Sequence, residues 1–225
     1  MGVKCSHAVD LQIALDLLDL DTAVDIALAV HDVADRLEVG TPLLRKYGMR
    51  SIERIREALP TTVLVADCKT MDRGGTDALL TLESGANGLI VAAAAPRSTL
   101  VRACTVAQEH GGFVMADSLG LEMEDLQQRL YGLQITSLIL HKGKDEQNHD
   151  DSLPISALKT AERINGLPQL AYAGGISSLN AAQLLPLTHI KLWIVGEAIV
   201  KADAPRDIAE RIYRLAHGAD AIECP

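Results

Sequence analysis

Residues 63–72 carry three charged groups whose types and spacing suit catalysis: Asp67, Lys69 and Asp72. The apolar first half of this segment predicts a buried strand. Side chains two positions apart on a strand point the same way, which puts Asp67 and Lys69 on one face, roughly 7 Å apart. Asp72 falls in the loop that follows. Charged groups that leave a core strand together are costly unless they pair or perform chemistry, so they form either a structural ion pair or part of a catalytic site.

Short apolar runs alternate with amphipathic stretches eight times along the 225 residues. The expected strands are 11–17, 35–40, 62–69, 88–93, 113–118, 137–142, 169–174 and 191–197. The expected helices are 21–33, 43–58, 74–85, 97–110, 122–131, 153–165, 178–185 and 205–217. Eight strand–helix units predict a single (β/α)8 TIM barrel domain over residues 1–225. A doubly wound open sheet is the alternative, but no G-x-G-x-x-G follows the first strand.

Strand alternation brings ionisable groups from five of the eight strands to the same end of the barrel interior. These groups are Asp16, Glu38, Asp67 with Lys69, Asp117 and His141. Active sites of this architecture lie at the C-terminal ends of the strands. The convergence therefore favours a catalytic site over a structural ion pair.

The proposed site is acidic. Its five carboxylates (Asp16, Glu38, Asp67, Asp72 and Asp117) and Lys69 sum to −4, and such repulsion raises pKa values unless a cation compensates. Oxygen ligands favour Mg²⁺ or Mn²⁺, and Glu38 and Asp67, which end adjacent strands, are the best-placed ligands. The alternative is that the carboxylates pair with Lys69 and Arg36.

A metal, a lysine and carboxylates together suit the stabilisation of an enediolate beside a carbonyl group. His141 lies at the rim of the same site, where an imidazole can move a proton to or from oxygen. A structural role for this histidine is the alternative.

A second signal follows strands seven and eight, where Gly174 and Gly175 end one strand and Gly196 ends the next. Loops at these positions commonly bind phosphate through backbone N–H groups and a helix N-terminus, and glycine lets the backbone approach the anion. Glu197 is unexpected there, because a carboxylate repels phosphate. Either it points away, or the site holds a less anionic group.

Composition excludes several other classes of function. The net charge is −9, from 21 basic and 30 acidic residues, with no basic tract, which argues against nucleic acid as a partner. No apolar run approaches the ~20 residues that span a bilayer, and the N-terminus lacks the apolar stretch of a signal peptide. The four cysteines show no paired spacing of a zinc site or redox motif. We expect a cytoplasmic protein with reduced thiols and no membrane contact.

The motifs in their order resemble the orotidine 5'-monophosphate decarboxylase superfamily. Within it they are similar to the branch of 3-hexulose-6-phosphate synthase and 3-keto-L-gulonate-6-phosphate decarboxylase. The segments that carry the resemblance span the chain: ALD at 14–16, EVGTP at 38–42, DCKTMDRGG at 67–75, His141, AGGI at 173–176 and VGEAI at 195–199.

The resemblance implies an Mg²⁺-dependent enzyme that acts on a phosphorylated ketose through an enediolate. In the synthase this intermediate forms from ribulose 5-phosphate and attacks formaldehyde, and in the decarboxylase it forms by loss of CO₂. The implied roles are metal binding for Glu38 and Asp67, contact with the enediolate oxygens for Lys69, proton transfer for His141, contact with sugar hydroxyls for Asp16 and Asp117, and reach into a partner subunit's site for Asp72. The last role implies a homodimer with shared active sites.

The two branches differ near Glu197. The segments KTMDRGG and AGGI look more like the synthase. The decarboxylase has an arginine after the strand-eight glycine and the synthase typically has a small residue, so Glu197 fits neither pattern. The main prediction is a metal-dependent aldolase of the synthase type. The alternatives are a decarboxylase of a β-keto sugar acid phosphate and, supported only by Glu197, a non-catalytic sugar-phosphate-binding barrel.

Overall fold

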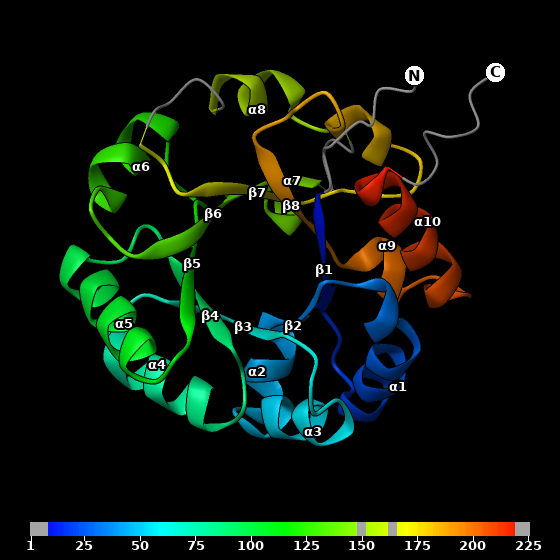
Figure 1. Cartoon of the computed structure of the whole chain (residues 1–225), viewed down its shortest axis with the longest axis horizontal. Helices are drawn as coiled ribbons and strands as arrows, with labels where there is room; N and C mark the ends of the chain where they lie inside the picture. The colour runs from blue at the N-terminus through cyan, green and yellow to red at the C-terminus, as the bar shows by residue number, and fades with distance from the viewer. Residues whose placement is uncertain (1–8, 148–151, 162–165, 219–225) are drawn as a thin grey trace, which may run out of the picture.

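Eight parallel strands close into a barrel in the order β1 to β8 (Figure 1). The computed structural model describes residues 9–147, 152–161 and 166–218. The strands are β1 (Asp10–Leu15), β2 (Arg36–Val39), β3 (Leu64–Thr70), β4 (Gly88–Ala92), β5 (Phe113–Asp117), β6 (Ile135–His141), β7 (Gln169–Ala173) and β8 (Ile190–Val195). β1 pairs with both β2 and β8, so the sheet has no free edge. The predicted TIM barrel is confirmed.

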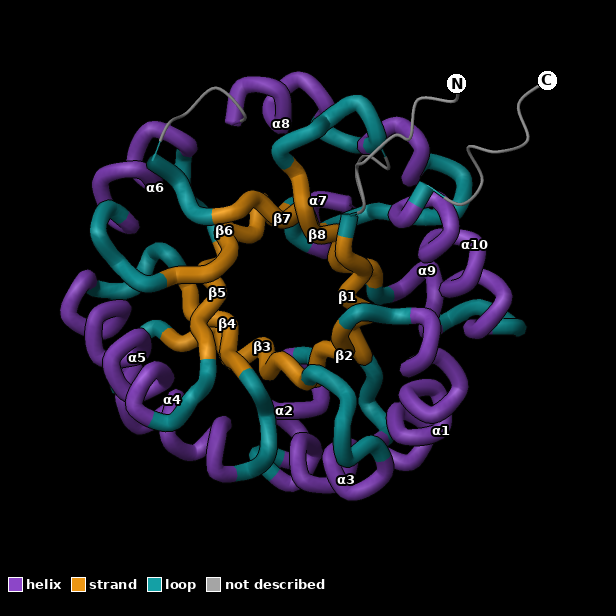
Figure 2. Tube along the Cα trace, viewed as in Figure 1, coloured by secondary structure: helices purple, strands orange, loops and turns teal. Residues whose placement is uncertain are grey.

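Helices form a ring outside the strands, except that the short α7 lies inside this ring, next to β7 and β8 (Figure 2). The longer ones are α1 (Leu20–Val30), α2 (Thr41–Tyr47), α3 (Arg50–Ala58), α4 (Gly74–Glu83), α5 (Arg97–Glu109), α6 (Met123–Leu130), α8 (Ile155–Ala161) and α10 (Pro205–His217). The shorter ones are η1 (His31–Val33), α7 (Lys144–Gln147), η2 (Ala181–Leu184) and α9 (Glu197–Val200). Among the described residues, no helix is both long and apolar enough to cross a membrane.

Two apolar clusters flank the strands, as alternation along a strand requires. The inner cluster fills the barrel with Ala14, Val65, Ile90, Met115, Ile139, Ala171, Ala173, Leu192 and Ile194. The outer cluster joins the opposite strand faces to the helices; β1 gives Leu11, Ile13 and Leu15 to it. The large aliphatic side chains of β1 thus lie under the helices, and its inward positions are left to small or polar residues.

Three expected helices differ from those observed. The stretch 43–58 is two helices, because Gly48 adopts a left-handed φ of 60° after α2 and ends it. Only the 3-10 turn η2 forms within 178–185, and α7 and α9 are short turns of four residues each. Four residues are too few to show helical periodicity, which explains why α7 and α9 were not predicted. Part of the expected helix 153–165 lies outside the described residues.

Strand β3 is irregular where its charged residues occur. Its pairing with β4 shifts register between Ala66 and Thr70, and Lys69 has a φ of 45°. A positive φ is uncommon for a residue other than glycine, and such conformations gather at functional sites. The bulge re-aims the side chain of Lys69, so simple alternation does not fully describe this position.

Candidate active site

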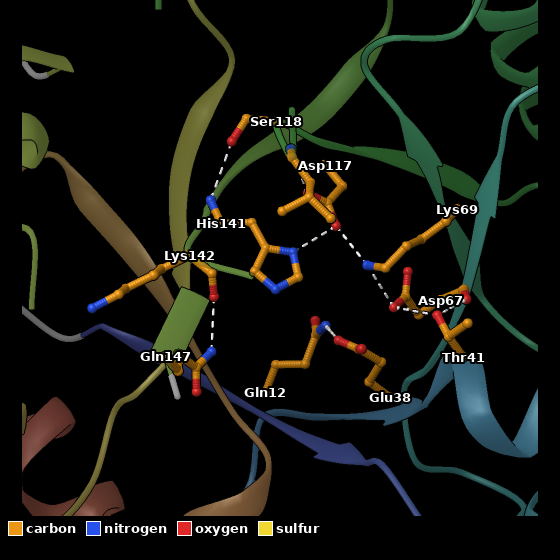
Figure 3. Close-up of polar contacts among 11 residues, drawn as sticks. Gln12, Glu38, Thr41, Asp67, Lys69, Asp117, Ser118, His141, Lys142 and Gln147 are labelled. Carbon is orange, nitrogen blue, oxygen red and sulfur yellow. Dashed lines mark hydrogen bonds and ion pairs between the residues drawn. The ribbon is translucent and has the colours of Figure 1, made fainter. Parts of the chain in front are cut away.

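A network of four charged or ionisable side chains lies at the C-terminal ends of β3, β5 and β6 (Figure 3). Asp117 Oδ2 is 2.6 Å from Lys69 Nζ and 2.7 Å from His141 Nδ1. The same Lys69 Nζ is 2.9 Å from Asp67 Oδ2. The ammonium group is therefore held between two carboxylates, one of which also holds the imidazole.

Backbone and hydroxyl groups fix this network. The N–H of Leu119 donates to Asp117 Oδ1 at 2.9 Å, so both oxygens of that carboxylate are occupied. The N–H of His141 donates to the hydroxyl of Ser118 at 3.1 Å. Asp117 is 2% exposed at its side chain and His141 19%. The imidazole is held in place yet is still reached by solvent.

The network sets the charge state of its members. Burial lowers the pKa of Lys69, but the nearby carboxylates of Asp67 and Asp117 outweigh it and raise that pKa above the ordinary value. Burial raises the pKa of Asp117, but the hydrogen bond and charge of His141, together with Lys69, lower it to about 2. Lys69 is thus a fixed cation and Asp117 a fixed anion at neutral pH. A proton on His141 Nδ1, donated to Asp117, leaves Nε2 as the nitrogen that exchanges a proton with a ligand.

A second acidic group adjoins the network from β1 and β2. Glu38 is 4% exposed, and its Oε2 accepts a 2.5 Å hydrogen bond from Gln12 Nε2. Burial, and then repulsion from Asp67 and Asp16, raises the pKa of Glu38 well above its usual range. Asp16 is exposed at the barrel mouth, yet enclosure by the protein, followed by the charge of Asp67, also raises its pKa. The carboxylates of Glu38, Asp16 and Asp67 thus give this part of the site an excess of negative charge.

The carboxylates of Glu38 and Asp67 fit a divalent cation. They come from adjacent strands, with Glu38 in register with Val65, two residues before Asp67. Thr41 donates 2.8 Å hydrogen bonds to the Oδ2 and backbone O of Asp67, whereas the buried Oδ1 has no hydrogen-bond partner. A cation would both use that oxygen and relieve the repulsion that raises the pKa of Glu38.

The protein would supply only part of a coordination shell. Within the described part of the chain, no three His, Cys, Asp or Glu side chains gather into a metal-binding group. Mg²⁺ is commonly held by one or two carboxylates and completes its shell with water and substrate oxygens. Two protein ligands therefore suit Mg²⁺, or the chemically similar Mn²⁺, better than a metal that needs four protein ligands.

The predicted phosphate-binding glycines lie where expected, after β7 and β8. Gly174 and Gly175 have φ values of 113° and 72°, which residues other than glycine rarely adopt. A Cβ on Gly196 would lie 3.1 Å from Asp16 Oδ2. These glycines keep the loops close to the barrel mouth. After Gly174 and Gly175 the expected helix 178–185 is only the 3-10 turn η2. Gly196 leads into the four-residue turn α9, and the expected helix 205–217 follows it as α10.

Glu197 points to two lysines. Its carboxylate forms ion pairs with Lys144, on α7, and with Lys201 at 2.6 Å. Hydrogen bonds from these lysines lower the pKa of Glu197. The three side chains sum to +1, so this rim still attracts an anion. All three are well exposed, from 41% for Glu197 to 64% for Lys201.

Asp72 stands apart from the network. It is exposed, and within the described residues its only hydrogen bond comes from the N–H of Arg73, at 2.7 Å. It lines an outer groove of about 630 Å³ together with residues of α4 and α5, among them Leu80 and Arg102. A single chain thus does not bring Asp72 to Lys69.

Two side chains of this site have no role in the sequence-based prediction. Gln12 contacts Glu38, and Thr41 contacts Asp67. Both could have been found: Gln12 is a polar residue at an inward position of an apolar strand, and Thr41 lies within the EVGTP segment.

Comparisons with known proteins agree with this geometry. The profile of the "Orotidine 5'-phosphate decarboxylase / HUMPS family" matches residues 10–212. A probable 3-keto-L-gulonate-6-phosphate decarboxylase of Haemophilus influenzae is 33% identical over 216 residues, covering 90% of this chain and 94% of that protein. A 3-hexulose-6-phosphate synthase of Mycobacterium gastri is 35% identical over 138 residues, covering 61% and 67%.

A solved structure extends the likeness to three dimensions. The 3-hexulose-6-phosphate synthase of Salmonella typhimurium superposes with a TM-score of 0.86 at 31% identity, covering 92% of this chain and 98% of that one. Relatives named for both activities therefore align with nearly the whole barrel.

Proposed function

The chain belongs to the orotidine 5'-phosphate decarboxylase / HUMPS family, in the branch of the two sugar-phosphate lyases, and we propose that it is a carbon–carbon lyase of the 3-hexulose-6-phosphate synthase type. It would condense ribulose 5-phosphate with formaldehyde. One observation carries the proposal: Lys69, a fixed cation, lies between Asp67 and Asp117, and Asp117 also orients His141.

Lys69 and His141 have different roles in the proposed reaction. Removal of a proton from C1 of the ketose leaves its electron pair in an enediolate, and negative charge develops on the oxygens. Lys69 stabilises that charge as a preorganised cation. His141, through Nε2, accepts the proton that leaves C1. C1 of the enediolate then forms a bond to the formaldehyde carbon as the C=O π electrons move to oxygen, and His141 returns the proton to that oxygen.

We propose Glu38 and Asp67 as the ligands of a divalent cation, Mg²⁺ or Mn²⁺. Such a cation, when bound, would add Lewis-acid stabilisation of charge beside the reacting oxygens. Asp16 and Asp117 would contact sugar hydroxyls. Gly174, Gly175 and Gly196, with Lys144 and Lys201, would bind the phosphate at the opposite rim.

The test is a direct assay. The protein is incubated with ribulose 5-phosphate, formaldehyde and Mg²⁺, and the sugar phosphates are separated and identified by mass and NMR. We expect a hexulose phosphate one carbon longer than the substrate. Absence of this product at high enzyme concentration, with the protein folded, would overturn the synthase proposal.

Decarboxylation of 3-keto-L-gulonate 6-phosphate is the second candidate. The Haemophilus influenzae relative, named a probable decarboxylase, matches 90% of the chain at 33% identity and favours it. The same lysine and imidazole would stabilise an enediolate formed by loss of CO₂ and then protonate it. Release of CO₂ from this substrate, without synthesis of hexulose phosphate, would select the second candidate.

A homodimer with shared active sites is part of the proposal. The exposed Asp72 beside the α4–α5 groove, and the exposed Met71 and Leu80 near it (51% and 45%), suit a surface covered by a second copy. If Asp72 acts in the partner's site, each mixed dimer of a Lys69→Met and an Asp72→Asn chain regains one intact site of two. In an equal mixture whose chains reassort at random, half of the dimers are mixed, so activity recovers to about a quarter of wild type. Inactive mixtures of properly dimeric chains would contradict the shared site.

A non-catalytic sugar-phosphate-binding barrel is the least supported alternative. Its only basis was Glu197, and the pairing of that carboxylate with Lys144 and Lys201 weakens the objection to phosphate binding. It predicts ligand binding that Lys69→Ala leaves unchanged, and no turnover. A cytoplasmic location is also a proposal, supported by the free thiols of Cys68 and Cys104.

A further inference from the structure

Gln12 is a polar side chain buried completely within the barrel. It occupies an inward position of β1, beside Ile194 of β8 in the strand register. The inner apolar cluster, which includes Ala14 and Leu192, lies on the same strand face, and the register partner on β2, Arg36, directs its guanidinium to Asp10. A methionine or leucine of similar size would fill this place without the cost of taking an amide out of water. Packing alone therefore does not account for a glutamine here.

The amide of Gln12 makes one strong contact, and that contact is to Glu38. Its Nε2 donates to Glu38 Oε2 at 2.5 Å. Within the part of the chain that the structure describes, it is the only hydrogen-bond donor to the Glu38 side chain. The neighbouring carboxylates of Asp67 and Asp16 repel the Glu38 carboxylate, whereas the hydrogen bond from Gln12 holds it. The hydrogen bond from Gln12 thus fixes the orientation of the Glu38 carboxylate.

The other end of the amide is unpaired. Gln12 Oε1 is buried and has no hydrogen-bond partner. A buried carbonyl without a donor is costly, and native proteins rarely leave one. Water in the shell of a divalent cation would be such a donor, and Mg²⁺ usually keeps several waters. The amide therefore has one group suited to a carboxylate ligand and one suited to a hydrated cation.

We propose that Gln12 is a positioning residue that orients Glu38, and the hydration shell beside it, for the divalent cation. This inference rests on the metal-binding role proposed above for Glu38 and Asp67. Groups that orient metal ligands commonly change metal affinity 10- to 100-fold when they are removed. Gln12 would touch neither the sugar phosphate nor the reacting carbons, so its effect must appear first in metal binding.

The test compares Mn²⁺ binding by wild-type protein, Gln12→Met and Ser137→Ala, measured by the loss of the free Mn²⁺ signal in electron paramagnetic resonance. Ser137 is the matched control, since it is a buried polar residue of β6 on the same inward side as Ile139 and His141. We expect Mn²⁺ affinity to fall about 10- to 100-fold in Gln12→Met and to stay unchanged in Ser137→Ala. Thermal unfolding without metal is measured in parallel, because a purely structural role would move the melting temperature alone.

Each outcome is decisive. Wild-type Mn²⁺ affinity in folded Gln12→Met would overturn the inference and leave the metal-binding proposal intact. No Mn²⁺ binding by the wild-type protein would overturn the proposed metal role, and the inference with it. If Gln12→Met does not fold, Gln12→Asn serves instead: it keeps a polar amide but withdraws it by one methylene, so unchanged affinity in that variant would likewise overturn the inference.

Discussion

The two halves of the barrel mouth are built differently. On the β2, β3, β5 and β6 side, buried carboxylates hold Lys69 and His141 through contacts of 2.6 to 2.9 Å. On the β7 and β8 side, glycines shape the loops, and Glu197 pairs with two lysines that are 58% and 64% exposed. The first half is largely buried, and the second is open to solvent and salt.

This difference separates the chemistry from the choice of substrate. Ion pairs in a buried network are strong and are costly to disturb, whereas exposed pairs contribute about 0–1 kcal/mol. The buried half suits an enediolate whichever bond the enzyme makes or breaks. The exposed half can be altered at little cost in stability, and it contains Glu197, the residue that the sequence resemblance did not lead us to expect. Each prediction below compares the two halves, starting with the largest effect.

Replacement of Lys69 should give the largest loss. Lys69→Met removes the cation that stabilises the enediolate, so we expect kcat to fall at least about 10²- to 10³-fold, the loss typical of one oxyanion-stabilising group. Steady-state kinetics of the purified variant measure this. The exposed Lys159→Met, on α8, is the matched control and should keep wild-type activity. A near-normal kcat for Lys69→Met would contradict the proposal that the buried half of the barrel mouth carries the chemistry.

Asp117→Asn should lower both activity and stability. The folded pKa of Asp117, about 2, lies below the ordinary value of about 3.9 in unfolded chains. The ionised group therefore stabilises the fold above pH 4, and this contribution is lost as the pH falls through about 2. We expect Asp117→Asn to cost about 2 kcal/mol of unfolding free energy at pH 7, with the difference from wild type shrinking between pH 4 and 2. Urea unfolding across this pH range measures it, and a constant difference would contradict the prediction.

Glu38→Gln should change stability in the opposite direction. The pKa of Glu38 is raised in the folded protein, so stability falls as the pH rises above the ordinary value of about 4.3 in unfolded chains, and the full loss is present once the pH exceeds the raised folded value. Without divalent cations, Glu38→Gln should therefore melt at a higher temperature than wild type at neutral or higher pH, and it should lose activity. Calorimetry with EDTA present measures the first effect. A lower melting temperature for the variant under these conditions would contradict the inference that Glu38, Asp67 and Asp16 repel one another in the buried half of the barrel mouth.

Glu197→Gln should have the smallest effect. Loss of two exposed ion pairs should change the unfolding free energy by less than about 1 kcal/mol. Removal of a negative charge beside the bound phosphate should lower KM for the phosphorylated substrate by about fivefold at low salt, with little change in kcat. Kinetics at low and high ionic strength measure this. A large fall in kcat would show that the exposed half takes part in the chemistry.

Much of the fold and part of the site could be predicted from the sequence. The period-two pattern of β1, with leucine and isoleucine outward and Ala14 inward, is a local property that the barrel keeps. The meeting of Asp67, Asp117 and His141 at one end of the barrel followed from strand alternation, because parallel strands end on the same side. These predictions depend only on which face of a strand a residue occupies.

The remaining features depend on contacts between distant segments. The bulge that gives Lys69 its φ of 45° arises in the pairing of β3 with β4, and no local pattern marks it. The pairing of Glu197 with Lys144 joins the loops after β8 and β6. Asp72 lies outside the network, on a loop after β3. In the proposed homodimer this loop would act in the active site of the partner chain. Such features need the folded arrangement to be known.

The most direct test of the central claim is hydrogen exchange at C1 of ribulose 5-phosphate. The protein is incubated with this ketose and Mg²⁺ in D₂O, without formaldehyde, and the C1 proton signals are followed by NMR. Enediolate formation within the buried network predicts that wild-type protein replaces a C1 proton with deuterium and that Lys69→Met does not. Full retention of both C1 protons at high concentrations of folded, metal-supplied wild-type protein would contradict it.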